Sequence, residues 1–287
     1  MAVRVLPEEI RQEVDGMNQT TVIVRGGGDL ATGTIYRLFR CGYPVLVLET
    51  ADPSAIRREA AFCEAARLGE KTVEGIVCER ILEPEACAGV WRRGRIPLLV
   101  DEQARAVEVL KPQVVVDAIL AKKNLGTRRD MAPLTIGLGP GFTAGLDVDC
   151  VIETMRGHRL GRVLLEGAAI PNTGVPGMIG GYGKERVIHA PASGVIRNQA
   201  SIGDWVEQGQ EIARIGQVPV PASITGVLRG IIRDGYQVKE GLKIADIDPR
   251  AGERENCFTI SDKARCIAGG VLEAVVSWEN GMWRPEK

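Results

Sequence analysis

The sequence contains few of the residues from which metal sites and disulfide frameworks are built. It has only two histidines, and its seven cysteines are widely spread, without a Cys-x-x-Cys pair. These features argue against a zinc site and against a disulfide-stabilised fold, and we expect no metal ligands. Reduced thiols are typical of the cytoplasm, so the sequence predicts a cytoplasmic protein.

Long apolar runs and a charge excess are also missing. No run approaches the ~20 residues that a membrane helix needs, and residues 1–17 lack the basic start and apolar middle of a signal peptide. The net charge of -1 gives no electrostatic attraction for nucleic acid or an anionic membrane, and neither is an expected partner. With 287 residues and 45% apolar content, the chain is long enough for two soluble domains.

The C-terminal third contains an internal repeat at a constant offset of 32 residues. Gly194 corresponds to Gly226, Val206 to Val238 and Ile215 to Ile247. Each copy consists of short β-type segments separated by glycines, which suit turns with positive φ. Because a copy of this length cannot cover its own apolar face, we expect the two copies to pack as one quasi-two-fold β unit.

The spacing of glycine and valine in both copies resembles the biotinyl/lipoyl-domain fold, a flattened barrel-sandwich of two related halves. In carrier members of that family, a lysine on the hairpin that joins the halves takes biotin or lipoate. No lysine occurs here between Lys184 and Lys239. The resemblance therefore implies a structural or protein-docking module without carrier function.

The N-terminal part begins with a predicted βαβ unit. A β-branched run at residues 21–25 leads into Gly26, Gly27 and Gly28, a helical pattern follows, and a second strand ends at Glu49. The spacing Gly26-x-Gly28-x-x-Ala31 fits the dinucleotide fingerprint, and an acid about 20 residues further on suits a ribose diol. We therefore expect nucleotide binding, with a turn retained only for packing as the alternative.

Two further glycine or lysine loops follow predicted strands. The apolar run at residues 114–120 leads into Lys122, Lys123 and Asn124, and a strand near residue 136 leads into Gly139 and Gly141. Carboxyl ends of parallel strands meet at one edge of a sheet, so these loops should converge on the first glycine turn. The two lysines suit either a phosphate or solvent, and Asp117 suits either a structural or a functional role.

The combined motifs resemble the accessory proteins of selenium-dependent molybdenum hydroxylases. The resemblance rests on residues 22–33 (VIVRGGGDLATG), 116–124 (VDAILAKKN), 137–142 (GLGPGF) and 260–265 (ISDKAR). It implies a maturation factor that handles molybdenum cofactor, with a molybdenum hydroxylase client or another maturation factor as partner. It assigns no catalytic residue, so whether the protein is an enzyme stays open.

The expected fold is α/β: a Rossmann-like parallel sheet, then an all-β barrel-sandwich and a C-terminal helix that Ser261 caps. The expected domains are an extension (residues 1–20), the nucleotide-binding domain (21–180), the biotinyl/lipoyl-like domain (184–250), and a helix and tail (251–287) that pack on the first domain. The predicted cofactor-binding residues are Gly26, Gly27, Gly28, Asp29, Leu30, Ala31, Glu49, Lys122, Lys123, Asn124, Gly139 and Gly141.

The small-molecule partner is expected to be a nucleotide, with NAD or a molybdopterin dinucleotide as candidates. Two alternative functions remain open on the residues alone. One is an NAD-dependent dehydrogenase resembling the precorrin dehydrogenases of the siroheme pathway, which also open with a strand and three glycines. The other is a regulatory protein that senses a nucleotide.

Overall fold

The structure, a computed structural model, describes residues 19–174 and 177–285. The described chain forms two compact units, which we call unit 1 (residues 19–53, 62–172 and 260–285) and unit 2 (residues 54–61 and the described part of 173–259). Residues 1–18 of the expected N-terminal extension lie outside the described residues. No helix in the described ranges combines the length and the apolar character needed to cross a membrane.

Unit 1 is built on a nine-stranded sheet. In order across the sheet, its strands are β10 (Val163–Leu164), β9 (Cys150–Ile152), β7 (Leu134–Leu138), β6 (Val114–Asp117), β1 (Val22–Arg25), β2 (Val45–Glu49), β5 (Ile96–Val100), β4 (Ile76–Ile81) and β3 (Glu70–Val73). The seven inner strands are parallel, whereas β10 and β3 are antiparallel to their neighbours. A separate two-stranded sheet joins β8 (Thr143–Ala144) to β11 (Gly167–Ala168).

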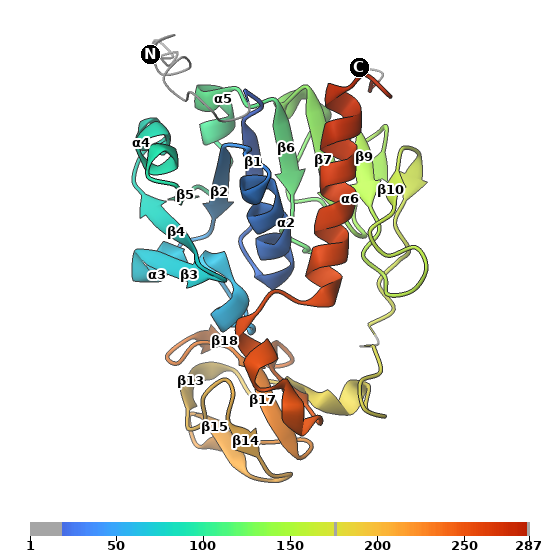
Figure 1. The fold of residues 1–287 in the computed structure, drawn as a ribbon. Coiled ribbons are helices and arrows are strands. Elements are labelled where there is room, and N and C mark those ends of the chain that lie inside the picture. The colour runs from blue at the N-terminus through green and yellow to red at the C-terminus, as the bar shows by residue number, and fades with distance from the viewer. Residues whose placement is uncertain (1–18, 175–176, 286–287) are drawn as a thin grey trace. The chain divides into compact units, whose positions relative to one another are not determined.

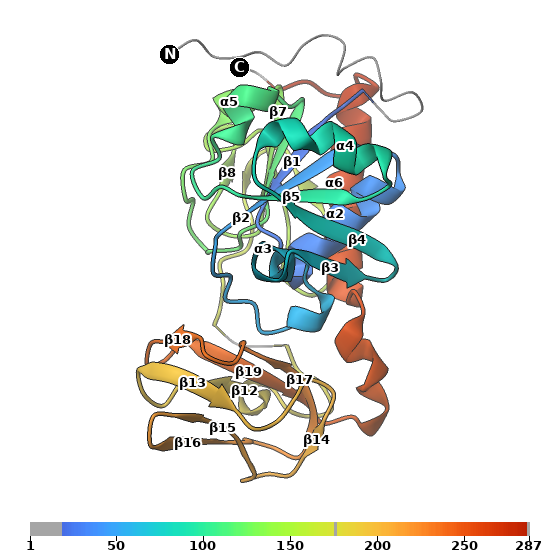
Figure 2. The ribbon, with the colours of Figure 1, turned by 90° about the vertical axis from the view of Figure 1, so that its left-hand side faces the viewer.

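Helices cover both faces of this sheet. They are α2 (Asp29–Arg40), α3 (Ala65–Leu68), α4 (Cys87–Arg92), α5 (Ala106–Leu110) and α6 (Asp262–Glu279). Figures 1 and 2 show α2 and α6 side by side on one face, with α4 and α5 on the other. Along β1, Val22 and Val24 join the core under α2 and α6, whereas Ile23 joins the core under α4 and α5. This alternation is the two-residue period of a strand that is buried on both faces.

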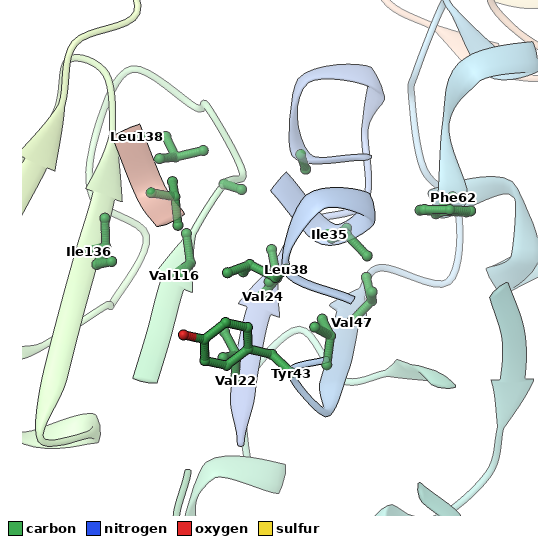
Figure 3. Packing of buried hydrophobic residues seen from close by; sticks show 14 of the residues in the cluster. Val22, Val24, Ile35, Leu38, Tyr43, Val47, Phe62, Val116, Ile136 and Leu138 are labelled. Carbon is green, nitrogen blue, oxygen red and sulfur yellow. The ribbon is translucent and has the colours of Figure 1, made fainter. Parts of the chain in front are cut away.

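The first helix packs as its apolar spacing requires. Ile35 and Leu38 of α2 are fully buried with Val24 and Val47 of the sheet (Figure 3). The helix ends at Arg40 with Cys41 as its C-cap, and Gly42 follows with a φ of +88°, a conformation that favours glycine. The predicted strand–turn–helix–strand order of residues 21–49 is therefore present.

The last helix returns to unit 1 and crosses α2 at close range. The side-chain oxygen of Ser261 accepts a hydrogen bond from the Ala264 N–H (3.2 Å), which confirms the predicted cap. A Cβ atom at Gly33 would lie only 2.8 Å from the Cβ atom of Ala264. Glycine and alanine at this crossing let the two helices approach more closely than larger side chains would allow.

Unit 2 consists of two four-stranded antiparallel sheets. The first has the order β12 (Val187–His189), β19 (Lys243–Asp248), β17 (Gly226–Ile231) and β14 (Trp205–Val206), and the second has the order β16 (Val218–Pro221), β15 (Glu211–Ile215), β13 (Gly194–Asn198) and β18 (Gln237–Val238). The repeat offset relates β13 to β17, β14 to β18 and β15 to β19. Each copy contributes its middle strand to the sheet of the other copy.

The α/β class is correct, but the predicted fold needs two corrections. The large sheet is mixed, because Glu74 and Gly75 both have positive φ and turn the chain directly back from β3 into β4. The biotinyl/lipoyl barrel is not shown: among the described residues, no strand pairing joins the two sheets of unit 2. Glycine spacing predicts where strands turn, but it does not determine whether the sheets close.

Candidate functional site

The glycine turn after β1 is packed against the loop that follows β6. Gly26 has a φ of +94°, and its N–H donates to the Leu48 carbonyl (2.7 Å). A Cβ atom at Gly26 would lie 3.0 Å from both the carbonyl oxygen of Ala118 and the Cα atom of Ile119. Both the backbone conformation and the space therefore require glycine at this position.

Glu49 holds the same turn from the neighbouring strand. Its Oε2 accepts the Gly27 N–H (2.7 Å), and its Oε1 accepts the Thr50 N–H (2.8 Å). Burial raises the pKa of this carboxyl, although both N–H groups oppose the shift. The sequence predicts a ribose contact for Glu49, and the structure adds a second role, because each carboxylate oxygen already binds backbone within the chain.

Gly28 differs from the two glycines before it. It is the N-cap of α2 with φ −62° and ψ 177°, a conformation open to any residue, and no side chain caps the helix there. A Cβ atom at Gly28 would meet no atom of the chain within 4 Å. Nothing inside the described chain therefore requires glycine at this position.

The three residues after Gly28 contribute little side-chain surface to a ligand. Ala31 is fully buried, and Leu30 is partly buried against the core beneath α2. Asp29 is half-buried in the first turn of the helix. A ligand at this turn would therefore meet mainly backbone and the Asp29 carboxylate.

The acid at the end of β6 has a structural environment. Asp117 is 1% exposed, its Oδ2 accepts the Thr127 hydroxyl (2.6 Å), and its Oδ1 accepts the Ile119 N–H (3.1 Å). The Arg25 guanidinium lies 3.7 Å from Oδ2 and also donates to the Thr127 hydroxyl. Burial raises the pKa of Asp117, and these partners oppose the shift. Asp117 therefore ties β1, β6 and the following loop together.

Asn124 stabilises its own turn, whereas the two lysines before it face solvent. The Asn124 Oδ1 accepts the N–H groups of Gly126 (2.9 Å) and Thr127 (2.8 Å), and its Nδ2 donates to the Thr127 carbonyl (2.8 Å). Lys122 has a φ of +63°, and both Lys122 and Lys123 are exposed. Neither forms an ion pair within the part of the chain that the structure describes.

The glycines after β7 bring the third loop to the same edge. A Cβ atom at Gly141 would lie 2.7 Å from the backbone nitrogen of Lys123. One at Gly139 would lie 2.5 Å from the Thr154 hydroxyl oxygen, just past the end of β9. The loops after β1, β6 and β7 therefore meet at the carboxyl edge of the sheet, with backbone packed on backbone.

Residues that the sequence analysis did not assign to the site lie beside it. Glu153 is 1% exposed, and its carboxylate accepts the N–H groups of Met155 (2.7 Å) and Ile170 (2.8 Å). Lys263, in the first turn of α6, is half-buried and interacts electrostatically with Asp29 and Glu153. The only signal in the sequence was the ISDKAR string, which contributed to a resemblance but indicated no position in space.

The described residues include no group of three or more histidine, cysteine or acidic side chains placed to hold a metal ion. The carboxyl edge presents backbone N–H groups, lysine amines and carboxylates.

The chain is similar in sequence to a curated protein. No family model matches the chain. The chain is 50% identical over 255 residues to the uncharacterized protein YqeB of Escherichia coli strain K12, in an alignment that covers 89% of this chain and 47% of that protein. The chain thus spans about half the length of the curated relative it matches.

Solved structures give only weak likenesses. A succinylglutamatedesuccinylase/aspartoacylase from Rhodobacter sphaeroides is 13% identical, with a TM-score of 0.27 and coverage of 80% of this chain and 86% of the other. The ectoine utilization protein EutE (DoeB) from Ruegeria pomeroyi is also 13% identical, with a TM-score of 0.21 and coverage of 84% and 61%. At these TM-scores the likenesses assign neither a fold nor an activity to this chain.

The comparisons contradict the predicted relationship to accessory proteins of selenium-dependent molybdenum hydroxylases. The curated relative is described as uncharacterized, and the solved structures are described as desuccinylase or aspartoacylase proteins and an ectoine utilization protein. The predicted maturation role, with its molybdenum and selenium assignments, is therefore withdrawn. The dehydrogenase and nucleotide-sensor alternatives gain no support from these findings and are withdrawn with it.

Proposed function

We propose that unit 1 binds a phosphate-bearing small molecule at the carboxyl edge of its sheet. The observation that carries this proposal is Gly28, which begins α2 with open space around it and no internal reason to be glycine. A missing side chain at the start of a helix lets an anionic group approach the backbone N–H groups there. Packing explains Gly26 and Gly27, where an added Cβ atom would lie 3.0 Å from the Ala118 oxygen and 2.9 Å from the Cys63 nitrogen. Of the three glycines, Gly28 is therefore the one that an external group best explains.

The surrounding residues support a rigid site. Glu49 fixes the Gly27 N–H, and Asp117 with Asn124 fixes the loop that carries Lys122 and Lys123. The two exposed lysines add positive charge at the same edge. This charge attracts anions, and the range of the attraction decreases as the salt concentration rises. A preformed turn reduces the ordering cost of binding.

Isothermal titration calorimetry with pyrophosphate tests the proposal. We expect the wild-type protein to bind pyrophosphate and Gly28→Val to lose that binding, because an extended φ and ψ tolerate valine while its side chain fills the approach. Gly269→Ala is the matched control: it lies in α6 of the same unit, and its Cβ would meet only the end of Arg37, at 3.9 Å. This control should bind as the wild type does.

Two results would overturn the proposal. One is a wild-type protein that binds neither pyrophosphate nor orthophosphate. The other is undiminished binding by a folded Gly28→Val protein, which would place the anion elsewhere. Far-ultraviolet circular dichroism and the Tm of each variant establish that the proteins compared are folded.

A further inference from the structure

We propose that Lys263, rather than Lys122 or Lys123, is the basic residue that contacts the phosphate group of the ligand. This inference rests on the proposed function and specifies its site. Lys263 lies in the first turn of α6, a segment more than 200 residues from the glycine turn in sequence.

The crossing of α2 and α6 places Lys263 at the site. Gly33 and Ala264 are in close contact, because a Cβ atom added at Gly33 would lie 2.8 Å from the Cβ atom of Ala264. Asp29 precedes Gly33 by four residues, about one helical turn, and therefore lies on the same face of α2. Lys263 directly precedes Ala264, so its side chain starts next to the first turn of α2. Its electrostatic interaction with Asp29 agrees with this placement.

The charges around Lys263 leave its amine available. Asp262 forms a two-point ion pair with Arg156 (2.8 and 3.1 Å), and the Glu153 carboxylate accepts two backbone N–H groups. Within the described chain, Lys263 itself forms no ion pair or hydrogen bond through its amine. A half-buried ammonium without a direct partner is costly, and an anionic ligand would supply the missing partner.

Lys263 also offsets the negative charge of Asp29 at the site. Asp29 lies in the first turn of α2, where its carboxylate would repel a phosphate that approaches the Gly28 backbone. A cation beside Asp29 offsets this repulsion. Lys122 and Lys123 are exposed on the loop after β6, where water and salt screen them.

The protonation of Lys263 should make the affinity for a phosphate depend on pH. Burial lowers the pKa of Lys263, Arg156 lowers it further, and Asp29, Glu153 and Asp262 partly oppose the shift. A bound phosphate favours the charged amine and so raises this pKa again. Affinity for pyrophosphate should therefore fall as pH rises through the pKa of the free protein, and Lys263→Met should lose this component.

The first test is calorimetry with pyrophosphate on Lys263→Met and on the matched double variant Lys122→Met/Lys123→Met. We expect Lys263→Met to weaken binding by about 10- to 100-fold, the range for a lost hydrogen bond to a charged group. The double variant should lose less than about fivefold, as is usual for exposed charges. Lys263→Arg, which restores the cation, should recover most of the affinity.

The second test labels the amine directly with pyridoxal 5′-phosphate, which carries both a phosphate and an aldehyde. The neutral lysine amine attacks the aldehyde carbon, a C–N bond forms and water leaves. Borohydride then delivers a hydride to the imine carbon and fixes the label as a secondary amine. Peptide mass spectrometry should find Lys263 labelled ahead of Lys122 and Lys123, and added pyrophosphate should suppress this label.

The outcomes separate the inference from the proposed function. If the wild type binds pyrophosphate but a folded Lys263→Met protein binds equally well, the role of Lys263 is wrong and the site stands. If the label appears on Lys122 or Lys123 and pyrophosphate protects it there, those lysines contact the ligand instead. If the wild type binds no phosphate, the proposed function fails, and the inference fails with it.

Discussion

Two pairs of glycines, one pair in each unit, serve different purposes. In unit 2, Gly209 and Gly241 have positive φ and open space around the missing side chain, so the turn alone requires them. In unit 1, Gly26 and Gly141 have positive φ and also press against the backbone of another loop. The same residue type therefore marks a turn at Gly209 and Gly241 and a loop-to-loop contact at Gly26 and Gly141, and Gly28 fits neither description.

This difference shows what a glycine pattern can reveal. A repeated glycine at fixed spacing predicts turns in unit 2, because each turn is a local event between adjacent strands. The contacts of Gly26 and Gly141 join segments about 90 and 18 residues apart, and no spacing rule predicts them. At the start of α2, Gly28 lacks both reasons, so its absence of a side chain points to a group outside the chain.

We expect the largest effect from Asp117→Ala, which tests whether the loops of unit 1 depend on this buried acid. Asp117→Ala removes the acceptor for Thr127 and Ile119 and leaves the 4% exposed Arg25 without its carboxylate. Breaking a buried pair in this way typically costs about 3–5 kcal/mol. Urea denaturation should show this loss, and a loss below about 1 kcal/mol, as for a surface pair, would show that the loops stand without Asp117.

A pair of alanine variants tests the comparison directly. Gly26→Ala and Gly241→Ala both place a side chain at positive φ, which costs about 1–2 kcal/mol. Gly26→Ala also forces a Cβ atom to 3.0 Å from the Ala118 carbonyl oxygen, whereas Gly241→Ala meets no atom within 4 Å. We therefore expect Gly26→Ala to lower the free energy of unfolding by about 1–3 kcal/mol more than Gly241→Ala does. Equal losses would mean that backbone conformation alone explains both glycines.

A smaller effect is expected from Glu49, which supports the turn from the side. Glu49→Ala leaves the N–H groups of Gly27 and Thr50 without their acceptor. We expect a loss of about 1–3 kcal/mol, tempered by the water that a half-buried position admits. Amide hydrogen exchange should quicken at Gly27 and Thr50, while Asp204→Ala, which frees the Ser201 N–H in unit 2, should leave these amides unchanged.

The sequence predicted the inner frame of unit 1 because its strands have a strong local signal. The β-branched run before Gly26, the helical spacing of Ile35 and Leu38, and the cap at Ser261 all appear as expected. The antiparallel edge strand β3 has no such separate signal, because residues 72–78 have the composition of one continuous strand and only the positive φ at Glu74 and Gly75 divides β3 from β4.

The candidate site was predictable only in part, for a physical reason. Gly26, Lys122 and Gly141 follow strands that share one edge, so topology alone places their loops together. Glu49 and Asn124 stay predicted ligand contacts, and the structure adds hydrogen bonds from both side chains to nearby backbone, which the sequence did not indicate. Lys263 arrives through the packing of two helices far apart in sequence, which depends on the fit of Gly33 against Ala264 and not on a pattern.

The last prediction concerns the pH dependence of stability at Glu49. Burial raises the pKa of this carboxyl in the folded protein above its value of 4.5, while the unfolded chain keeps the ordinary value. Between the two pKa values the folded state holds a proton that the unfolded state has released, so the free energy of unfolding falls as pH rises through this window. Glu49→Gln has no proton to release and should lack this slope. The difference in stability between wild type and Glu49→Gln, measured by urea denaturation from about pH 4 to about pH 7, should therefore favour the wild type most at the acid end. Other titrating groups, such as Glu79 with its lowered pKa, cancel in this difference because both proteins contain them. A difference that stays constant with pH would show that the N–H groups of Gly27 and Thr50 balance the burial of Glu49. One that grows in favour of the wild type as pH rises would show that they outweigh burial and hold the carboxyl charged.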